Sequence, residues 1–100
     1  MIYVTYPTKE EAGSVSRALI EDTLVACANI FPSHETLYWW EGKIEEGREV
    51  AVIYKTTKGN FEAVKNVVLK RHSYDCPCVV ALPIEQAYEV FSDWIKSAVS

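Results

Sequence analysis

The residues best suited to chemistry gather just before the last apolar run of the sequence. Cys76 and Cys78 flank a single proline, and His72 precedes Cys76 by four residues. Because residues i and i+2 of an extended chain point to the same side, both thiols would face one ion, with the His72 imidazole nearby. Soft thiolates suit Cu(I), and thiolates combined with imidazole suit zinc. The spacing is therefore compatible with a metal site, for copper or for zinc.

Ordinary packing is the alternative for each of these candidate ligands. The spacing of Cys76 and Cys78 is not the usual C-x-x-C, so Cys78 would simply open a buried strand and Cys76 would be a surface residue. Cys27, a further candidate ligand, lies between two alanines in an apolar run, where a free cysteine packs as a small hydrophobe. His72 also suits a helix C-terminus, where a positive charge is favourable. A metal site completed by a second chain stays open beside these readings.

A second set of residues suits an anionic ligand. Lys55 and Thr56 stand at the end of a long β-forming run, and Tyr74 follows two residues after His72. An ammonium group, a hydroxyl and a phenol are all donors to an anion, provided that the fold brings them to one cleft. Purely structural roles explain the same residues as well.

Signatures of known catalytic sites are absent from the sequence. The four glycines, at positions 13, 42, 47 and 59, are too scattered for a phosphate-binding loop. No G-x-S-x-G elbow, no H-E-x-x-H helix and no carboxylate pair suited to acid–base catalysis is found. We therefore expect no enzymatic activity and no organic cofactor.

Length and charge narrow the class of protein further. One hundred residues form a single domain, residues 1–100. The net charge of -4 argues against a nucleic-acid partner, which would favour a basic surface. No signal peptide and no apolar run of about 18–20 residues, the length of a membrane span, is present. The three cysteines, an odd number, indicate a reduced chain. We expect a cytoplasmic protein without nucleic-acid or membrane partners.

The elements that must position these residues alternate between strand and helix patterns. Thr8 and Glu11 form a capping box, in which each side chain would bond the other residue's amide. Gly59–Asn60 would break the chain and cap a second helix. The expected elements are strands at 2–6, 25–31, 36–40 and 43–57, helices from the Thr8 cap to 22–23 and at 61–71, a strand at 79–84 buried on both faces, and a last helix over 87–98. This order predicts an α/β (α+β) fold: a ferredoxin-like βαββαβ sandwich with a long β-hairpin and an extra C-terminal helix.

The long strand after a predicted Glu41–Gly42 turn bears on assembly. A strand over residues 43–57 would measure roughly 50 Å at about 3.3 Å per residue, whereas a globule of this length is roughly 35 Å across. Trp39 and Trp40 would point to opposite faces of this hairpin, so both cannot enter one core. The hairpin must therefore protrude and needs a partner surface, for which another copy of the chain is the simplest choice.

Short segments spread over essentially the whole chain carry a resemblance to one family. They are 26–30 (ACANI), 38–45 (YWWEGKIE), 55–56 (KT), 72–77 (HSYDCP) and 82–84 (LPI), together with Tyr88 and Trp94. In this order they resemble the CutA divalent-cation-tolerance family, and WEGKIE is the most specific of them. Ser73 is a departure, because the family commonly has proline between this histidine and tyrosine.

The resemblance implies a ferredoxin-like subunit in a tight homotrimer, similar to PII-type signalling proteins with clefts between their subunits. It also implies metal binding and tolerance of divalent cations, notably copper. The expected function is thus a non-enzymatic, trimeric metal-binding or metal-response protein. A PII-like sensor that binds a nucleotide or anion in intersubunit clefts, and a mainly structural interaction trimer, are the alternatives. The expected interface residues are Tyr38, Trp39, Trp40, Glu41, Lys43, Glu45 and Glu49, and the expected cleft residues are Lys55, Thr56 and Tyr74.

Overall fold

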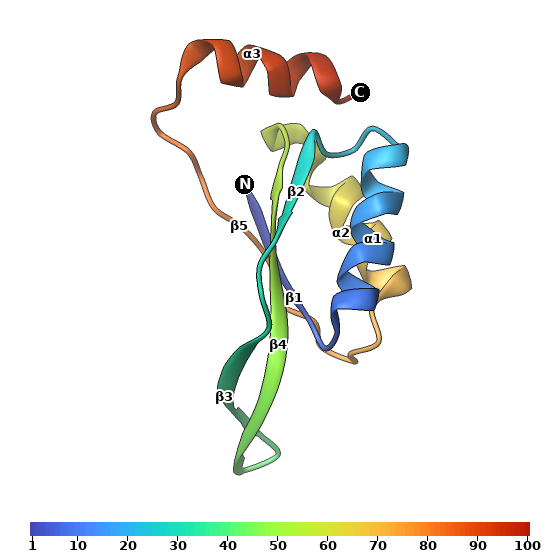
Figure 1. Ribbon diagram of the computed structural model, residues 1–100, viewed down its shortest axis with the longest axis vertical. Helices are drawn as coiled ribbons and strands as arrows, with labels where there is room; N and C mark the ends of the chain where they lie inside the picture. Colours follow the sequence, from blue (N-terminus) through green and yellow to red (C-terminus); the bar gives the residue numbers. More distant parts are fainter.

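The computed structural model describes residues 1–100 and has the predicted ferredoxin-like arrangement. Helices α1 and α2 cover one face of an antiparallel sheet, and α3 lies across one end of it (Figure 1). The strand order is β2-β4-β1-β5, and β3 pairs with the far part of β4. The elements are β1 (Ile2–Tyr6), α1 (Lys9–Glu21), β2 (Cys27–Ile30), β3 (His34–Trp40), β4 (Lys43–Lys55), a 3-10 turn (Lys58–Asn60), α2 (Phe61–Arg71), β5 (Val79–Ala81) and α3 (Glu89–Ala98).

The core lies between the sheet and the two helices that cover it. Val4 of β1 and Val52 of β4 face Leu19 of α1 and Val64 of α2, and all four side chains are fully buried. The first six residues of β4 are all exposed, and the seven that follow are buried or half-buried, so only the C-terminal half of this strand belongs to the core. No helix of the chain is both long enough and apolar enough to cross a membrane.

The start of α1 confirms half of the predicted capping box. The Thr8 hydroxyl accepts a hydrogen bond from the Glu11 amide at 3.1 Å. The Glu11 carboxylate, however, accepts a hydrogen bond from the backbone N–H of Ser73 at 3.0 Å, beyond the end of α2. Asn60 occupies the expected N-cap position of α2, but its side chain makes no capping hydrogen bond, because its amide donates to the Leu24 carbonyl at 3.0 Å.

A buried hydroxyl network crosses the core. The Tyr54 hydroxyl lies 2.6 Å from the Tyr6 hydroxyl and 2.9 Å from the Ser16 hydroxyl. Burial raises the pKa of both phenols, so the phenols stay protonated and act as hydrogen-bond donors. The network ties β1 and β4 to α1 with every buried polar atom paired.

Replacing Tyr54 by phenylalanine removes the central hydroxyl of this network. The variant leaves the Tyr6 and Ser16 hydroxyls buried without this partner, so we expect the free energy of unfolding to fall by about 1–3 kcal/mol. Urea unfolding at a fixed protein concentration measures the loss. Tyr3→Phe, on the same strand as Tyr6 but outside the network, is the matched control and should change stability by less than about 0.5 kcal/mol. Equal stability of the two variants would contradict this role of the network.

The predicted turn and the protruding hairpin are confirmed. Glu41 and Gly42 have φ values of 51° and 79°, the left-handed pair that a tight two-residue hairpin turn requires. Gly47 lies inside β4, opposite Thr36 of β3. The strands β3 and β4 extend well beyond the helices (Figure 1), and the molecule measures 45 × 26 × 23 Å.

Two expectations about the C-terminal third need correction. The strand expected at 79–84 is only Val79–Ala81, and it is not buried on both faces. β5 is an edge strand that pairs with β1 alone, so Val80 remains 43 % exposed. The last helix begins at Glu89 rather than near 87, and although it is amphipathic it buries no residue fully.

Candidate functional site

A pocket of about 450 Å³ lies at the base of the hairpin. We call it the hairpin pocket. The hairpin supplies one wall, the loop that follows α2 supplies the other, and β1 contributes a single residue between them. Its lining residues are Thr5, Tyr38, Trp40, Glu49, Ser73, Tyr74, Asp75, Cys76 and Cys78.

His72 holds the loop wall of this pocket in place. It directly follows α2, its side chain is fully buried, and its ring stacks on Tyr6 with centroids 4.9 Å apart. Its Nε2–H donates to the Thr5 carbonyl at 2.7 Å, and its Nδ1 accepts from the Tyr74 backbone N–H at 3.1 Å. The Glu11 carboxylate supports the same loop through Ser73. The loop is thus anchored to β1 and α1.

This geometry bears on the expectation that His72 binds an ion. A carbonyl only accepts and an amide N–H only donates, so these two contacts engage both ring nitrogens, Nε2 as a donor and Nδ1 as an acceptor. Neither ring nitrogen then has a lone pair to offer. The structure therefore places His72 behind the pocket, where it positions the loop.

Both candidate thiols beyond His72 open to the hairpin pocket. Cys76 and Cys78 are exposed and line it together, as the spacing predicts. Cys27 lies on β2 opposite Lys55 and does not line this pocket. No three His, Cys, Asp or Glu side chains of one chain gather closely enough to hold an ion. The chain thus presents an incomplete donor set.

The charge of the hairpin pocket favours a cation. Glu49 and Asp75 line it, and no lysine, arginine or histidine does. Burial and the neighbouring Glu49 carboxylate raise the pKa of Tyr74 to about 12. Burial first, and then the Glu49 charge, also raise the pKa of the Cys78 thiol. The thiol is therefore protonated at neutral pH, and an ion that binds it must displace a proton.

The residues expected to share an anion cleft lie apart within one chain. Tyr74 lines the hairpin pocket, whereas Lys55 and Thr56 line a second pocket of about 260 Å³ beneath α3. We call this second space the α3 pocket. It is lined by Met1, Lys55, Thr56, Thr57, Lys58, Ile84, Ala87, Phe91, Ser92, Ile95 and Lys96.

The two faces of the hairpin have different surroundings. Tyr38, Trp40 and Glu49 share the face that turns to the hairpin pocket. Trp39 pairs with Ile44 across the hairpin and points the other way, beside Leu37. We call these three side chains the outer hairpin face. Trp39 is 72 % exposed, Ile44 63 % and Leu37 67 %. The charged residues Glu41, Lys43 and Glu45 are also exposed and make no ion pair within the chain.

Sequence reasoning missed several residues of these surfaces. The place of Leu37 and Ile44 on the same face as Trp39 could have been predicted from the sequence. The Glu41–Gly42 turn sets the pairing of the two strands and so puts Trp39 opposite Ile44. Asp75 stands beside Cys76 and could also have been noticed. Nothing in the sequence near Thr5 indicates that it lines the pocket, because its position there depends on long-range packing.

Comparisons with known proteins agree over almost the whole chain. Residues 1–98 match the family model of the CutA1 divalent ion tolerance protein. The divalent-cation tolerance protein CutA of Archaeoglobus fulgidus is 46 % identical over 98 residues, which cover 98 % of this chain and 95 % of that protein. The protein of the same name from Thermococcus kodakarensis is 39 % identical over 95 residues, with coverage of 95 % and 90 %.

Solved structures agree with the fold. The structure of the periplasmic divalent cation tolerance protein CutA from Archaeoglobus fulgidus superimposes with a TM-score of 0.96 at 44 % identity, covering 99 % of this chain and 96 % of the other. The divalent cation tolerance protein from Thermus thermophilus gives a TM-score of 0.96 at 34 % identity, with the same coverage. The arrangement of sheet, hairpin and α3 is therefore shared with these proteins.

Proposed function

This chain belongs to the CutA1 divalent ion tolerance family, and we propose that it binds a metal ion reversibly, copper first and zinc second, as a homotrimer without enzymatic activity. The observation that carries the proposal is that Cys76 and Cys78 open into one pocket beside Glu49 and Asp75. Thiolates suit copper and zinc, and the two carboxylates favour any cation.

The proposed ion lies where two copies of the chain meet. One chain offers the two thiols without the further ligand that would complete a site. A tetrahedral zinc ion needs four ligands, which is more than this pair supplies. A second copy seated against the hairpin pocket would supply them, and Tyr38 and Trp40 would limit the access of water.

The apolar surface of the hairpin supports assembly. The outer hairpin face presents three large apolar side chains on a projecting ribbon, far from the chain's own core. Contiguous apolar surface of this kind marks a protein–protein interface. We propose three copies because that is the assembly which the family resemblance implies, and closed rings are the usual way to cover such a surface.

We propose a cytoplasmic location. The support is the presence of three free cysteines, two of them exposed, since exposed thiols persist in reducing compartments. The Archaeoglobus fulgidus protein of known structure is described as periplasmic, so the two proteins would differ in this respect. Cell fractionation with a compartment marker tests the location, and recovery in an oxidising compartment would contradict it.

Calorimetry tests the metal proposal. Zinc, and separately Cu(I) under anaerobic conditions, is titrated into the assembled protein. Loss of even a supporting group typically weakens metal binding about 10–100-fold, so Cys76→Ser with Cys78→Ser should weaken it by at least about 100-fold. Cys27→Ser is the matched control and should leave the affinity within about twofold, because Cys27 lies outside the pocket. Binding that survives the double replacement, or that is lost in the control, would contradict the thiol site.

Acid should weaken the proposed binding. Because burial raises the pKa of Cys78, its thiol is protonated when free and must be deprotonated when it binds an ion. Each proton displaced makes affinity fall about tenfold per pH unit, so we expect at least about tenfold weaker zinc binding at about pH 6.5 than at about pH 7.5. Calorimetry in buffers of different ionisation enthalpy counts the released protons. An affinity that is flat over this range, with no proton release, would contradict thiolate ligation.

A further inference from the structure

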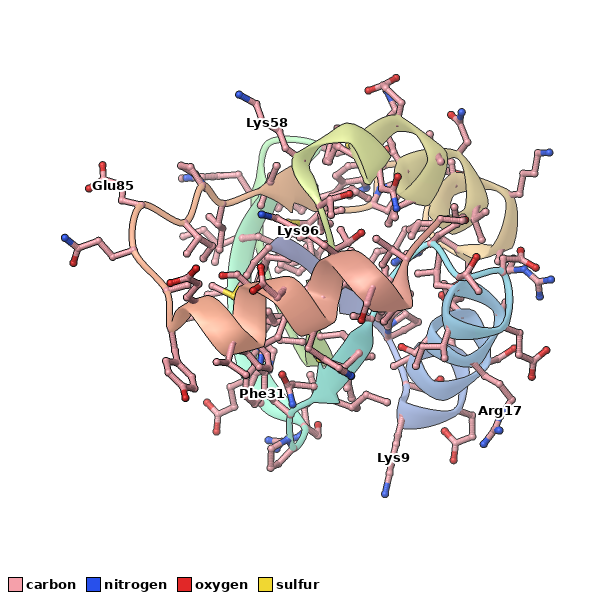
Figure 2. The ribbon with its side chains drawn as sticks, turned by 90° about the horizontal axis from the view of Figure 1, so that it is seen from above. Lys9, Arg17, Phe31, Lys58, Glu85 and Lys96 are labelled. Carbon is pink, nitrogen blue, oxygen red and sulfur yellow. The ribbon has the colours of Figure 1, made fainter.

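Basic residues converge on the α3 pocket from three parts of the chain. Lys55 ends β4, Lys58 begins the following 3-10 turn, and Lys96 lies near the end of α3. Looking down on α3, Lys96 and Lys58 lie on the same side of the helix, and Lys9 lies on the other side (Figure 2). Three of the ten basic residues of the chain therefore line one small pocket.

No acidic residue offsets these charges within the pocket. The chain has fourteen Asp and Glu residues and a net charge of -4, yet none of them lines this space. Glu85, on the segment that leads into α3, points outward and away from the helix (Figure 2). Like charges that face one space without counter-charges repel one another, so an anion between them would relieve the repulsion.

The pocket also offers hydroxyl donors. The Thr56 hydroxyl is already used, because it donates to the Leu24 carbonyl at 2.6 Å. Thr57 and Ser92 line the pocket with side-chain hydroxyls that form no hydrogen bond within the chain. These two hydroxyls are free to donate to an oxyanion held by the lysines.

Part of the pocket lining is apolar. It includes Phe91 and Ile95 of α3 and Ile84 of the preceding segment. The Lys55 ammonium lies 5.5 Å from the centre of the Phe91 ring, so a positive charge lies beside this apolar part. The pocket's volume of about 260 Å³ is close to the lower end of the roughly 300–1,000 Å³ of pockets for drug-sized ligands, which favours a small ligand.

We propose that the α3 pocket binds a small amphiphilic oxyanion, with its phosphate or carboxylate group between Lys55, Lys58 and Lys96 and an apolar group against Phe91 and Ile95. The ligand bridges α3 to the end of β4. This site is separate from the hairpin pocket and does not depend on metal binding. A phosphate monoester and a carboxylate share the same chemistry here, and the doubly charged phosphate gains more from three lysines.

Calorimetry on the protein tests this site with four small probes. Phenyl phosphate and benzoate carry the two oxyanions, inorganic phosphate lacks the apolar group, and benzyl alcohol lacks the charge. The test variant is Lys55→Gln with Lys58→Gln and Lys96→Gln. The matched control, Lys9→Gln with Arg17→Gln and Lys70→Gln, removes the same charge from exposed positions outside the pocket.

Phenyl phosphate should bind best, with benzoate weaker and benzyl alcohol not bound. The test variant should bind phenyl phosphate at least about tenfold more weakly, since the loss of each charge-assisted hydrogen bond weakens the affinity severalfold. The control should stay within about twofold. Phe91→Ala should weaken phenyl phosphate but leave inorganic phosphate unchanged. Benzoate stronger than phenyl phosphate would assign the site to carboxylates. Absence of binding by either oxyanion, or equal losses in the test and control variants, would overturn the proposal.

Discussion

Replacing Trp39 and Ile44 together by serine is expected to convert the proposed homotrimer to monomers at micromolar concentration. The two side chains face each other across the hairpin and are largely exposed in the single chain. Burying each one in an interface contributes about 1.5–3 kcal/mol, and the loss repeats in every copy. Light scattering coupled to size-exclusion chromatography measures the mass in solution.

The control for this experiment alters exposed apolar residues elsewhere. Tyr88→Ser with Val90→Ser removes two side chains that are as exposed as the hairpin pair but lie at the start of α3. This variant should keep the assembled mass. If the Trp39 and Ile44 variant has the same mass in solution as the unchanged protein after dilution, the assembly does not depend on the outer hairpin face. Because folding of the core does not involve either residue, the monomers should retain their secondary structure by circular dichroism.

Replacing His72 by alanine is expected to cost about 3–5 kcal/mol of unfolding free energy, the loss typical of deleting a buried ring. The variant removes the stack on Tyr6 and leaves the Thr5 carbonyl without its hydrogen-bond partner. Against a total stability of about 5–15 kcal/mol, this loss is large. Denaturant unfolding at fixed concentration measures it.

The same variant should release the loop that carries the thiols. Without the Nδ1 acceptor, the Tyr74 amide loses its bond, so its hydrogen exchange should accelerate. His34→Ala is the matched control, because that histidine is partly exposed on the hairpin and makes no side-chain hydrogen bond. His72→Gln, which keeps a donor for Thr5, should recover part of the stability. Equal losses at His72 and His34 would show that the ring does not anchor the loop.

Much of the fold was predictable because its signals are local. The Glu41–Gly42 turn has a glycine at a position of positive φ, and it fixes the pairing of the hairpin over seven residue pairs. The Thr8 cap lies within one turn of the helix that it starts. The order of strands and helices follows from periodicity alone, and it determined the ferredoxin-like topology.

The parts that sequence reasoning missed depend on contacts between distant residues. His72 was expected to be a ligand, but its ring bonds Thr5, 67 positions earlier in the sequence. Tyr54 meets Tyr6 across 48 positions, and no pattern near either tyrosine indicates the pairing. The apolar run at 79–84 indicated burial on both faces, because composition does not tell a central strand from an edge strand.

In the candidate sites, too, the local features were predictable from the sequence and the long-range features were not. Cys76 and Cys78 share a pocket because their spacing in an extended segment is a local property. Lys55 and Tyr74 were grouped as one cleft because both are polar residues near element ends. Within one chain they line different pockets, since β4 ends beneath α3 while the loop after α2 faces the base of the hairpin, and a cleft between subunits stays a prediction. Such placement follows from topology and not from spacing.

The most direct test of metal binding between copies is a crystal structure of the protein with bound zinc, measured with anomalous scattering at the zinc edge. The account predicts one anomalous peak per chain in the hairpin pocket, bonded to the sulfur atoms of Cys76 and Cys78 at about 2.3 Å and to at least one atom of a neighbouring copy. A peak at Cys27 alone, a peak held entirely by one chain, or no peak with the thiols reduced would contradict it.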